Sequence, residues 1–249
     1  MLLNLSEPTP AAITVAFPET RNACSLCIQR ELCLPLEIAP DDMARIDRLV
    51  AARRRLKRGQ HIYRAGEPFK YIFVVRTGYF KTDVLTEDGR DQVTGFQMSG
   101  DILGLDGIGN EIHSCNAVAL EDGELCPIPF AELEHLAGQI HPLQRHLHKI
   151  LGREIVRDHD VMVLLGAMRA EERIAAFLLN LSQRFASRGY SPTDFHLRMT
   201  REEIGSYLGL QLETASRAFS HLQEEGIIAI HIKHVQILDL PRLHRAIGR

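Results

Sequence analysis

The sequence predicts an α+β protein with three parts: an antiparallel β-roll, one long helix and a C-terminal winged helix-turn-helix. Three observations support this fold class. Short β-type runs separated by glycines fill the first half, an apolar seam of helical period follows, and two short helices around a glycine precede an alternating segment. The chain has 249 residues, 45% of them hydrophobic, and a net charge of −3. These values are typical of a soluble globular protein with one or two domains.

Glycines and short apolar runs mark the predicted roll. Nine of the eighteen glycines lie between residues 59 and 109. The pair Asp88-Gly89 is a hairpin-turn signal between two of the runs. Many short strands with turns at regular spacing are typical of a small antiparallel roll or barrel. The predicted strands cover residues 71–75, 78–85, 92–98, 115–120 and 124–130.

The segment before the roll is less regular. Residues 1–20, which contain three prolines, are expected to form a mobile arm. Residues 40–57 are expected to form a short helix with Asp41 as a possible N-cap. Its predicted apolar face consists of Met43, Ile46, Leu49 and Val50. The chain shows no secretory signal and no apolar run long enough to span a bilayer, so we expect a cytoplasmic protein without a membrane partner.

A helical period begins near Pro142 and predicts a long helix. A single seam of about three heptads needs a partner helix, so it predicts a homodimer; packing on the chain's own roll is the alternative. The seam consists of Leu147, Leu151, Ile155, Asp158, Met162 and Leu165. In a two-fold dimer Asp158 faces its own copy, and repulsion between the carboxylates makes dimerisation marginal. Alternatively, Asp158 lies just beside the contact and is solvated.

A helix-turn-helix is predicted near the C-terminus. Thr200 and Glu203 form a capping box that starts a short helix. Gly209 ends this helix, and a second helix covers about residues 212–225. Two helices joined by a short glycine-containing turn are typical of this motif. The alternating segment 227–238 is expected to be its two-stranded wing.

The second helix of the pair has two different faces. Its predicted buried stripe consists of Leu212, Ala215, Phe219 and Leu222. On the other face, Arg217 can donate two bonds to guanine, Glu213 can accept from cytosine and Ser216 is permissive. Because residues near the start of a recognition helix reach base edges, we expect the chain to bind double-stranded DNA. The alternative is an i,i+4 ion pair between Glu213 and Arg217 on a solvated face.

Cysteines suggest a metal or redox site in a reducing cytoplasm. Cys24, Cys27 and Cys33 fall within ten residues, and the total of five is odd, unlike most disulfide scaffolds. A fourth thiolate, from Cys115 or Cys126, would complete either a zinc site or an iron–sulfur cluster. Spacing alone does not choose between these metals. The histidines of the long helix share no face, and we expect them to be solvated: His141, His146, His148 and His159.

The periods divide the chain into four predicted parts. Before the helix-turn-helix, residues 170–188 form an amphipathic helix that ends at Gly189, and residues 195–199 alternate as a strand. The predicted parts are an arm with the cysteine loop (1–36), a β-roll sensor domain (37–140), a dimerisation helix (141–168) and a winged helix-turn-helix domain (169–249).

Five segments together resemble the oxygen-responsive regulators of the FNR type in the Crp/Fnr superfamily of transcription factors. The similarity covers nearly the whole chain from Cys24 to about residue 245. The segments are CSLCIQRELC at 24–33, TEDGRDQVTGF at 86–96, GDILGLDGIG at 100–109, AEERIAAFLLNLSQRFASRGYSP at 170–192 and LETASR at 212–217. The resemblance implies that the roll is like a cyclic-nucleotide-binding domain.

The resemblance also implies a cofactor and a mechanism. It places a [4Fe–4S] cluster on four cysteines and leaves Cys115 as a free structural thiol; the four are Cys24, Cys27, Cys33 and Cys126. It places Ile155 and Asp158 in a dimer seam that forms while the cluster is intact and separates after oxygen converts it. The base-reading residues Glu213, Ser216 and Arg217 would read an inverted repeat of the TTGAT type. A surface near Asp88-Gly89 would contact RNA polymerase.

Two other functions are weighed against this one. A regulator gated by a small ligand such as a cyclic nucleotide needs an arginine for the phosphate, and residues 113–120 contain none. An electron-transfer or redox enzyme needs a donor site or substrate cleft, but GLDGIG at 104–109 is not a dinucleotide-binding loop. We therefore expect no enzyme activity. A structural zinc on the same cysteines would keep the DNA function and remove oxygen sensing.

Overall fold

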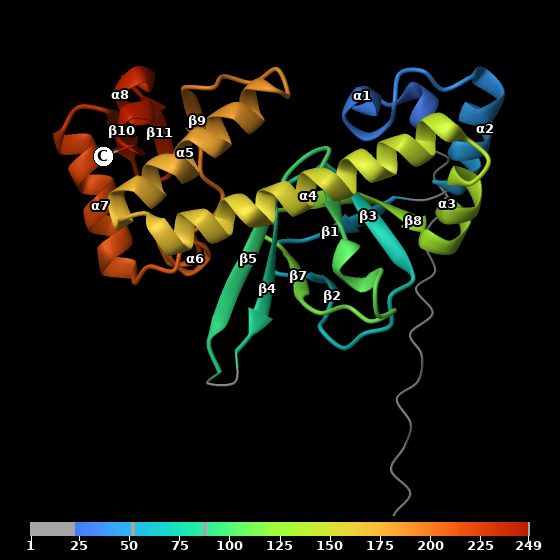
Figure 1. Cartoon of the computed structure of the whole chain (residues 1–249), viewed down its shortest axis with the longest axis horizontal. Coiled ribbons are helices and arrows are strands. Elements are labelled where there is room, and N and C mark those ends of the chain that lie inside the picture. The colour runs from blue at the N-terminus through green and yellow to red at the C-terminus, as the bar shows by residue number, and fades with distance from the viewer. Residues whose placement is uncertain (1–22, 51–52, 87–88, 249) are drawn as a thin grey trace, which may run out of the picture.

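The computed structural model describes residues 23–50, 53–86 and 89–248. A β-roll and a C-terminal domain lie at opposite ends of one long helix, α4 (Figure 1). The cysteine segment, with a 3-10 turn (Cys24–Leu26) and α1 (Arg30–Cys33), lies beside the N-terminal end of α4. The arm expected at residues 1–20 lies outside the described residues.

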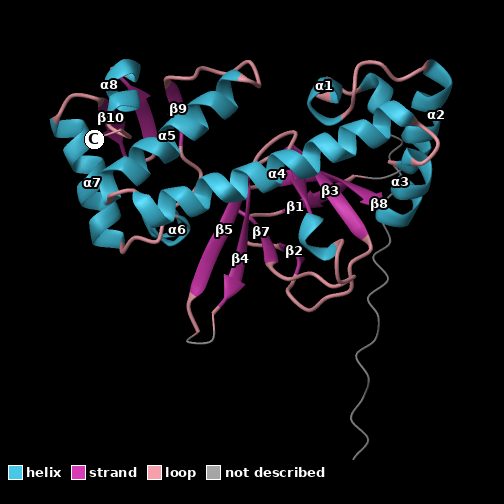
Figure 2. Ribbon diagram, viewed as in Figure 1, coloured by secondary structure: helices cyan, strands magenta, loops and turns pink. Residues whose placement is uncertain are grey.

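Two four-stranded antiparallel sheets form the roll, as the glycine-punctuated pattern predicts (Figure 2). One sheet has the order β1-β8-β3-β6 and the other has the order β2-β7-β4-β5. The strands are β1 (Arg54–Leu56), β2 (His61–Tyr63), β3 (Tyr71–Thr77), β4 (Phe80–Leu85), β5 (Asp91–Gln97), β6 (Ile102–Leu103), β7 (Asn116–Ala119) and β8 (Gly123–Pro129). A short 3-10 turn (Leu105–Gly107) follows β6, and α3 (Phe130–Ala137) follows β8.

The helix before the roll is shorter than its sequence pattern predicts. The helix α2 spans Pro40–Leu49, and β1 already begins at Arg54. The N-cap is Ala39, not Asp41. Proline disfavours a helical conformation in the residue before it and fits the first helical position, so Pro40 fixes the start of α2. The predicted apolar face of α2 is buried, including Met43 and Ile46.

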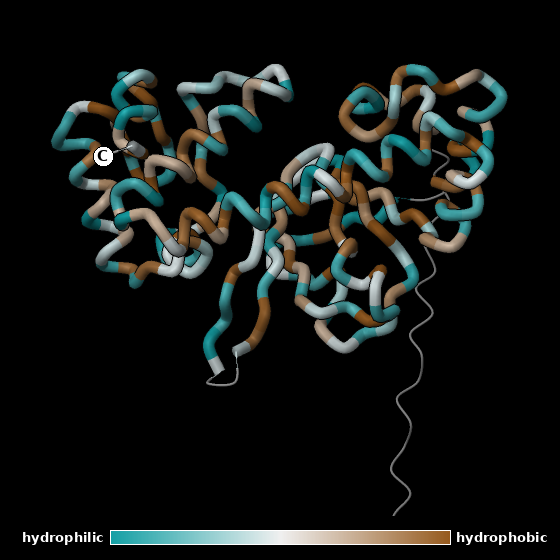
Figure 3. Tube along the Cα trace, viewed as in Figure 1, coloured by the Kyte–Doolittle hydropathy of each residue, from teal (hydrophilic) through white to brown (hydrophobic). Residues whose placement is uncertain are grey.

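The long helix α4 (His141–Ala167) has 27 residues and buries little of itself. Leu143 is its one buried residue, and Leu147 packs partly against the apolar cluster formed by α2, α3 and the outer face of the roll. Hydrophobic and hydrophilic residues alternate along it (Figure 3). Among the described residues, no helix is long and apolar enough to cross a membrane.

The C-terminal domain contains four helices and one three-stranded sheet of order β10-β11-β9. The elements are α5 (Ala170–Ala186), β9 (Asp194–His196), α6 (Arg201–Tyr207), α7 (Leu212–Glu224), β10 (Ile228–His231), β11 (His234–Ile237) and α8 (Leu240–Arg245). Gly189 and Gly209 have positive φ angles at the helix ends predicted for them, and Gly226 after α7 has one as well. The strand predicted at 195–199 is shorter in the structure. It is β9, Asp194–His196, and these are the residues that pair with β11.

The roll and the C-terminal domain share one apolar core. Val93, Phe96 and Met98, from β5 and the turn after it, belong to the same buried cluster as the residues of α5, α6 and α7. The ring of Phe96 lies 6.2 Å from that of Phe177 on α5 and 5.3 Å from that of Tyr207 on α6, measured between centroids. The β4–β5 hairpin therefore sets where the helix-turn-helix sits relative to the roll.

Replacing Phe96 tests this shared core. Phe96→Ala removes a side chain that is 2% exposed, so we expect a loss of about 3–5 kcal/mol in unfolding free energy. We also expect faster proteolysis between the roll and the C-terminal domain. Phe73→Ala, in the core of the roll alone, should lower stability without that release. Equal release by both variants would contradict the shared core.

Candidate metal centre and nucleic-acid interface

Four of the five cysteines line one pocket. Cys24, Cys27 and Cys33 come from the cysteine segment, and Cys126 comes from β8 of the roll. The pocket has a volume of about 60 Å³. Its apolar walls come from α2, the roll, α3 and α4, and include Ile46, Leu49, Val74, Ile128, Leu133 and Leu143. The fold thus brings together thiols that are 93 residues apart in the sequence.

Burial makes three of these thiols, those of Cys24, Cys33 and Cys126, poor acids. It raises the pKa of Cys24 and of Cys33 to about 12, and the neighbouring sulfur of Cys126 raises both further. Burial also raises the pKa of Cys126 to about 11. All four are free thiols. At neutral pH the metal-free pocket therefore holds Cys24, Cys33 and Cys126 protonated, and binding a metal there releases protons.

Arginines lie next to the sulfurs. The Arg76 guanidinium on β3 faces the thiol of Cys27, and Arg53 and Arg76 both act against the raised pKa of Cys126. Three buried polar atoms of residues that line the pocket have no hydrogen-bond partner: Gln29 Oε1, Arg30 Nε and Arg76 Nε. Two of these atoms are N–H donors of arginines that lie beside the thiols. The lining of the pocket therefore suits an anionic group, such as a cluster bound by thiolates.

The thiols surround a space and do not converge on one point. Among the described residues, no three His, Cys, Asp or Glu side chains are placed to hold a single metal ion. A tetrahedral zinc with bonds of about 2.3 Å to sulfur needs such convergence. Cys115 lies elsewhere, buried in the core of the roll, where its thiol interacts with Asp106.

Hydrogen bonds attach the cysteine segment to two helices. The Ser25 hydroxyl donates to Asp47 on α2 over 2.6 Å. On α4, His146 Nε2 lies 3.0 Å from the carbonyl oxygen of Cys33. The expectation that His146 is solvated is therefore wrong, because the cysteine segment folds back over the start of α4. No local sequence signal could have found this contact, since 113 residues separate its two partners.

The predicted dimer seam is exposed over most of its length. Ile155 and Met162 are 56% and 59% exposed, and Asp158 is exposed between them. Leu151 and Leu165 are 38% and 37% exposed, whereas Leu147 at the start of the seam packs partly on the chain's own core. An apolar row of this kind on a single helix is typical of a helix–helix contact.

The helix-turn-helix has the predicted caps. Thr200 Oγ1 accepts from the backbone N–H of Glu203, and the Glu203 carboxylate accepts from the N–H of Thr200. One prediction is wrong: Leu212 is 44% exposed and is not part of the buried stripe of α7. It is the first residue of that helix. Ala218 is buried in addition to the predicted Ala215, Phe219 and Leu222.

The three predicted base-reading residues point away from the core. Glu213 and Arg217 are exposed, and Ser216 is half-buried. In the described part of the chain no ion pair joins Glu213 to Arg217; the guanidinium of Arg217 lies 3.5 Å from the hydroxyl of Thr214 instead. The polar face of α7 is therefore available to a partner.

The interior of the roll is filled by side chains. Tyr63 stacks on His113 with 3.6 Å between ring centroids, and Phe73 is buried beside this pair. Asp106 accepts hydrogen bonds from the backbone N–H of Ser114 and from the Tyr63 hydroxyl. A carboxylate thus lies against residues 113–120, the segment in which a bound phosphate would need a cation.

Comparison with known proteins agrees with both halves of the fold. Residues 53–139 match the cyclic nucleotide-binding domain family, and residues 172–246 match the Crp-like helix-turn-helix domain family. The chain is 45% identical over 226 residues to the transcriptional regulatory protein Btr of Bordetella pertussis, covering 91% of this chain and 93% of the relative. The chain belongs to the Crp/Fnr family. It is a DNA-binding transcriptional regulator of the FNR type, and its relatives are regulators and not enzymes.

Further relatives and one solved structure extend this comparison. The chain is 44% identical to the transcriptional activator Anr of Pseudomonas aeruginosa, over 90% of this chain and 91% of that protein. It is 39% identical to the fumarate and nitrate reduction regulatory protein of Escherichia coli K12, over 90% of each chain. The structure of FixK2 from Bradyrhizobium japonicum is similar with a TM-score of 0.73 and 34% identity, covering 80% of this chain and 98% of that one. Crp/Fnr regulators bind DNA and act as dimers.

The Thr200 cap can be tested by substitution. Thr200→Ala removes the acceptor for the Glu203 N–H, so we expect unfolding free energy to fall by about 1 kcal/mol in urea denaturation. Thr200→Ser keeps the hydroxyl and should retain most of the stability. If the serine variant lost as much as the alanine variant, the methyl group and not the cap would account for the effect.

Proposed function

We propose that this regulator senses oxygen through a [4Fe–4S] cluster held by Cys24, Cys27, Cys33 and Cys126. The cluster-bound homodimer binds an inverted-repeat promoter site of the TTGAT type and regulates genes of anaerobic or microaerobic metabolism. It works in the cytoplasm and acts with RNA polymerase, through a surface near the β4–β5 hairpin. The observation that carries the proposal is the common pocket of four free thiols.

The chemistry of the donor set supports a cluster over a single zinc ion. Four thiolates are the usual ligands of a [4Fe–4S] cluster, and the four sulfurs here line a space in which no described trio converges on one ion. Arg76 and Arg53 place positive charge next to the sulfurs, which favours the thiolate form that ligation needs. When bound, the cluster supplies a redox-active group that oxygen converts.

The contacts of the cysteine segment suggest how the cofactor favours the dimer. Cys33 binds His146 of α4 through its carbonyl, and Leu143 of α4 lines the cysteine pocket. Ligation would therefore hold the segment against the start of α4, whose exposed seam forms the dimer. A cofactor that binds one conformation preferentially shifts the population toward it.

Binding of DNA rests on α7. Arg217 suits guanine, Glu213 suits cytosine and Ser216 adjusts to either, and their side chains lie on the polar face of the helix. In a two-fold dimer, two such helices would reach half-sites about one turn of DNA apart. The exposed Asp158 in the middle of the seam keeps the dimer weak enough to respond to the cofactor.

Matched cysteine variants test the cluster. After anaerobic reconstitution with iron and sulfide, Cys126→Ser should lose most bound iron and the broad visible absorption band. Cys115→Ser should keep both, because Cys115 lies in the roll core and not in the pocket. Admission of air to the wild type should bleach the band and convert dimer to monomer in gel filtration. A wild-type protein that stays colourless after reconstitution would falsify the cluster and leave a zinc- or ligand-gated regulator.

Substitution of Arg217 tests the DNA interface. Arg217→Ala should weaken binding to the TTGAT-type repeat by about 1–3 kcal/mol per half-site and relax the preference at one base position. Fluorescence anisotropy with specific and scrambled duplexes measures both effects. Arg198→Ala, a matched change on the strand side of the domain, should leave the base preference unaltered. An equal loss on both duplexes would mean that Arg217 contacts only the phosphates.

A further inference from the structure

Residues 98–101, the turn between β5 and β6, touch the cysteine segment on one side; we call them the junction turn. Leu32 packs directly on Gly100, where an added Cβ would lie 2.8 Å from the Cβ of Leu32. The Ser99 hydroxyl donates to the carbonyl oxygen of Arg76 over 2.6 Å, and Arg76 faces the Cys27 thiol. The cysteine pocket and the junction turn are therefore in contact through two separate routes.

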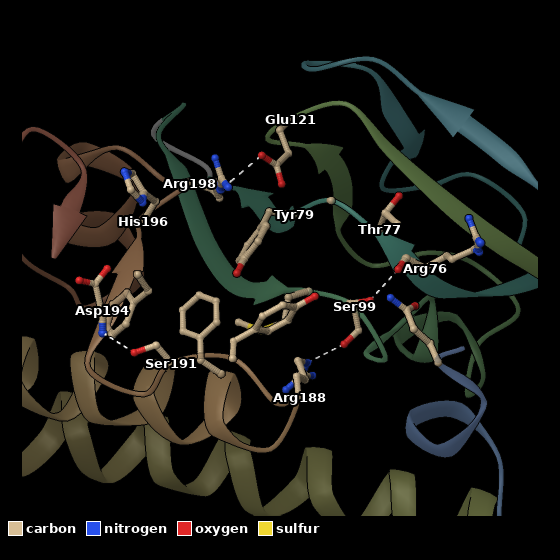
Figure 4. Close-up of a pocket in the computed structure, with 16 residues that line it drawn as sticks. Arg76, Thr77, Tyr79, Ser99, Glu121, Arg188, Ser191, Asp194, His196 and Arg198 are labelled. Atoms are coloured by element: carbon tan, nitrogen blue, oxygen red, sulfur yellow. Dashed lines mark hydrogen bonds and ion pairs between the residues drawn. The ribbon is translucent and has the colours of Figure 1, made fainter. Parts of the chain in front are cut away.

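The other side of the junction turn binds the C-terminal domain. Asp101 accepts from Arg184 Nη2 over 2.5 Å, in the last turn of α5, and from Arg188 Nη2 over 2.6 Å, just after that helix. Arg188 Nε also donates to the carbonyl oxygen of Ser99, as Figure 4 shows. The Asp101 side chain is only 17% exposed. Burial acts to raise the pKa of Asp101, but the two arginines hold it below its usual value.

A second ion pair crosses this side of the molecule, but it is more exposed than the contacts of Asp101. Figure 4 shows the cleft beside the junction turn, between the roll and β9. Its volume is about 410 Å³. Arg198 of the C-terminal domain pairs with Glu121 of the roll over 3.4 Å, and the two side chains are 47% and 31% exposed. The Asp101 side chain is 17% exposed, so its contacts are the more buried ionic link across this face. A buried carboxylate between two arginines holds its partners in one geometry, and its loss leaves both charges uncompensated.

The helix α5 in turn contacts the helix-turn-helix. Arg173, one turn into α5, donates to the carbonyl oxygen of Leu208 over 2.9 Å and to that of Leu165 at the end of α4 over 2.8 Å. Leu208 ends α6, directly before the turn that leads to the recognition helix. Arg173 therefore links α5 both to the helix-turn-helix and to the end of the dimer seam, so a movement of α5 acts on both.

We propose that Asp101 is a positioning residue that transmits the state of the cysteine segment to the recognition helix. Docking of the segment holds the junction turn through Leu32 and Arg76, and the turn holds α5 through Asp101. Release of the segment frees the turn and lets the C-terminal domain change its orientation. This regulation rests on the proposed function, since it gives the cysteine site its effect on DNA binding.

The first experiment measures coupling between the cofactor and DNA. The ratio of DNA affinities with and without the reconstituted cluster is determined for the wild type, Asp101→Asn and Asp122→Asn. We expect Asp101→Asn to reduce this ratio by about fivefold or more, because the link between the junction turn and α5 is lost. Bound iron should be unchanged. Asp122→Asn removes a carboxylate that pairs with Lys57 of the roll at an exposed site, and it should keep the wild-type ratio. An unchanged ratio for Asp101→Asn overturns the proposal.

A second experiment does not depend on the cluster or on DNA. Leu32→Ala loosens the packing on Gly100, so amide hydrogen exchange at the end of α5, residues 184–188, should become faster in the full-length protein. In an Asp101→Asn background the same substitution should add nothing, because the link is already broken. If Asp101→Asn does not fold, Arg188→Lys replaces it. Unchanged exchange in Leu32→Ala overturns the proposal, even where the wild type binds a cluster.

The two experiments also separate this proposal from the one it rests on. A wild type that binds no cluster, with exchange at α5 that still responds to Leu32→Ala, refutes the oxygen sensor and keeps the transmission. If the wild type shows cluster-dependent DNA binding but exchange at α5 does not respond to Leu32→Ala, the transmission is refuted and the oxygen sensor is kept.

Discussion

Phe96 packs against both α5 and α6, and most of the interdomain geometry depends on that contact. A strand of the roll thereby contributes to the core of the DNA-binding domain, with Val93 and Met98 beside it. Protein cores have nearly the density of crystals and change shape in discrete steps. The helix-turn-helix is thus held by the β4–β5 hairpin in one of few arrangements, and a signal from the roll can act on it directly.

Ion pairs add to the apolar contact of Phe96 in joining the roll to the C-terminal domain. Asp101, Arg184 and Arg188 form a buried ionic group at one edge of the shared core, and the carbonyl oxygen of Phe96 accepts from Arg184 over 2.8 Å and from Arg157 of α4 over 2.9 Å. A group of this kind contributes little net stability compared with apolar packing, but removing one partner is costly. It therefore specifies a geometry, which is what a regulator that couples two distant sites requires.

The cysteine pocket, unlike the ionic group around Asp101, is lined mainly by apolar side chains. Its thiols are buried among apolar side chains that raise the pKa of Cys24, Cys33 and Cys126, so the metal-free pocket favours the neutral forms. Positive charge is needed to convert them to thiolates, and Arg53 and Arg76 supply only part of it. A bound cationic centre would complete the set and hold the segment against α4. Folding of the segment and occupation of the site are then one equilibrium.

Local sequence patterns determined the elements of this protein. Glycine spacing predicted the roll, the capping box of Thr200 and Glu203 predicted α6, and the period of three and four predicted α4, because these signals depend on neighbouring residues. The end of α2 at Leu49, its N-cap at Ala39 and the exposure of Leu212 were missed, since helix ends depend on single residues and on what packs beside them.

Only the tertiary structure decided how the sites are connected. The contacts of His146 with Cys33, of Leu32 with Gly100 and of Asp101 with Arg188 join residues 113, 68 and 87 positions apart. No period or motif encodes such pairs, because they arise where separate elements meet after the chain has folded. The sequence by itself determined which chemical groups the protein carries, and the packing of β5 on α5 determined which of them act on one another.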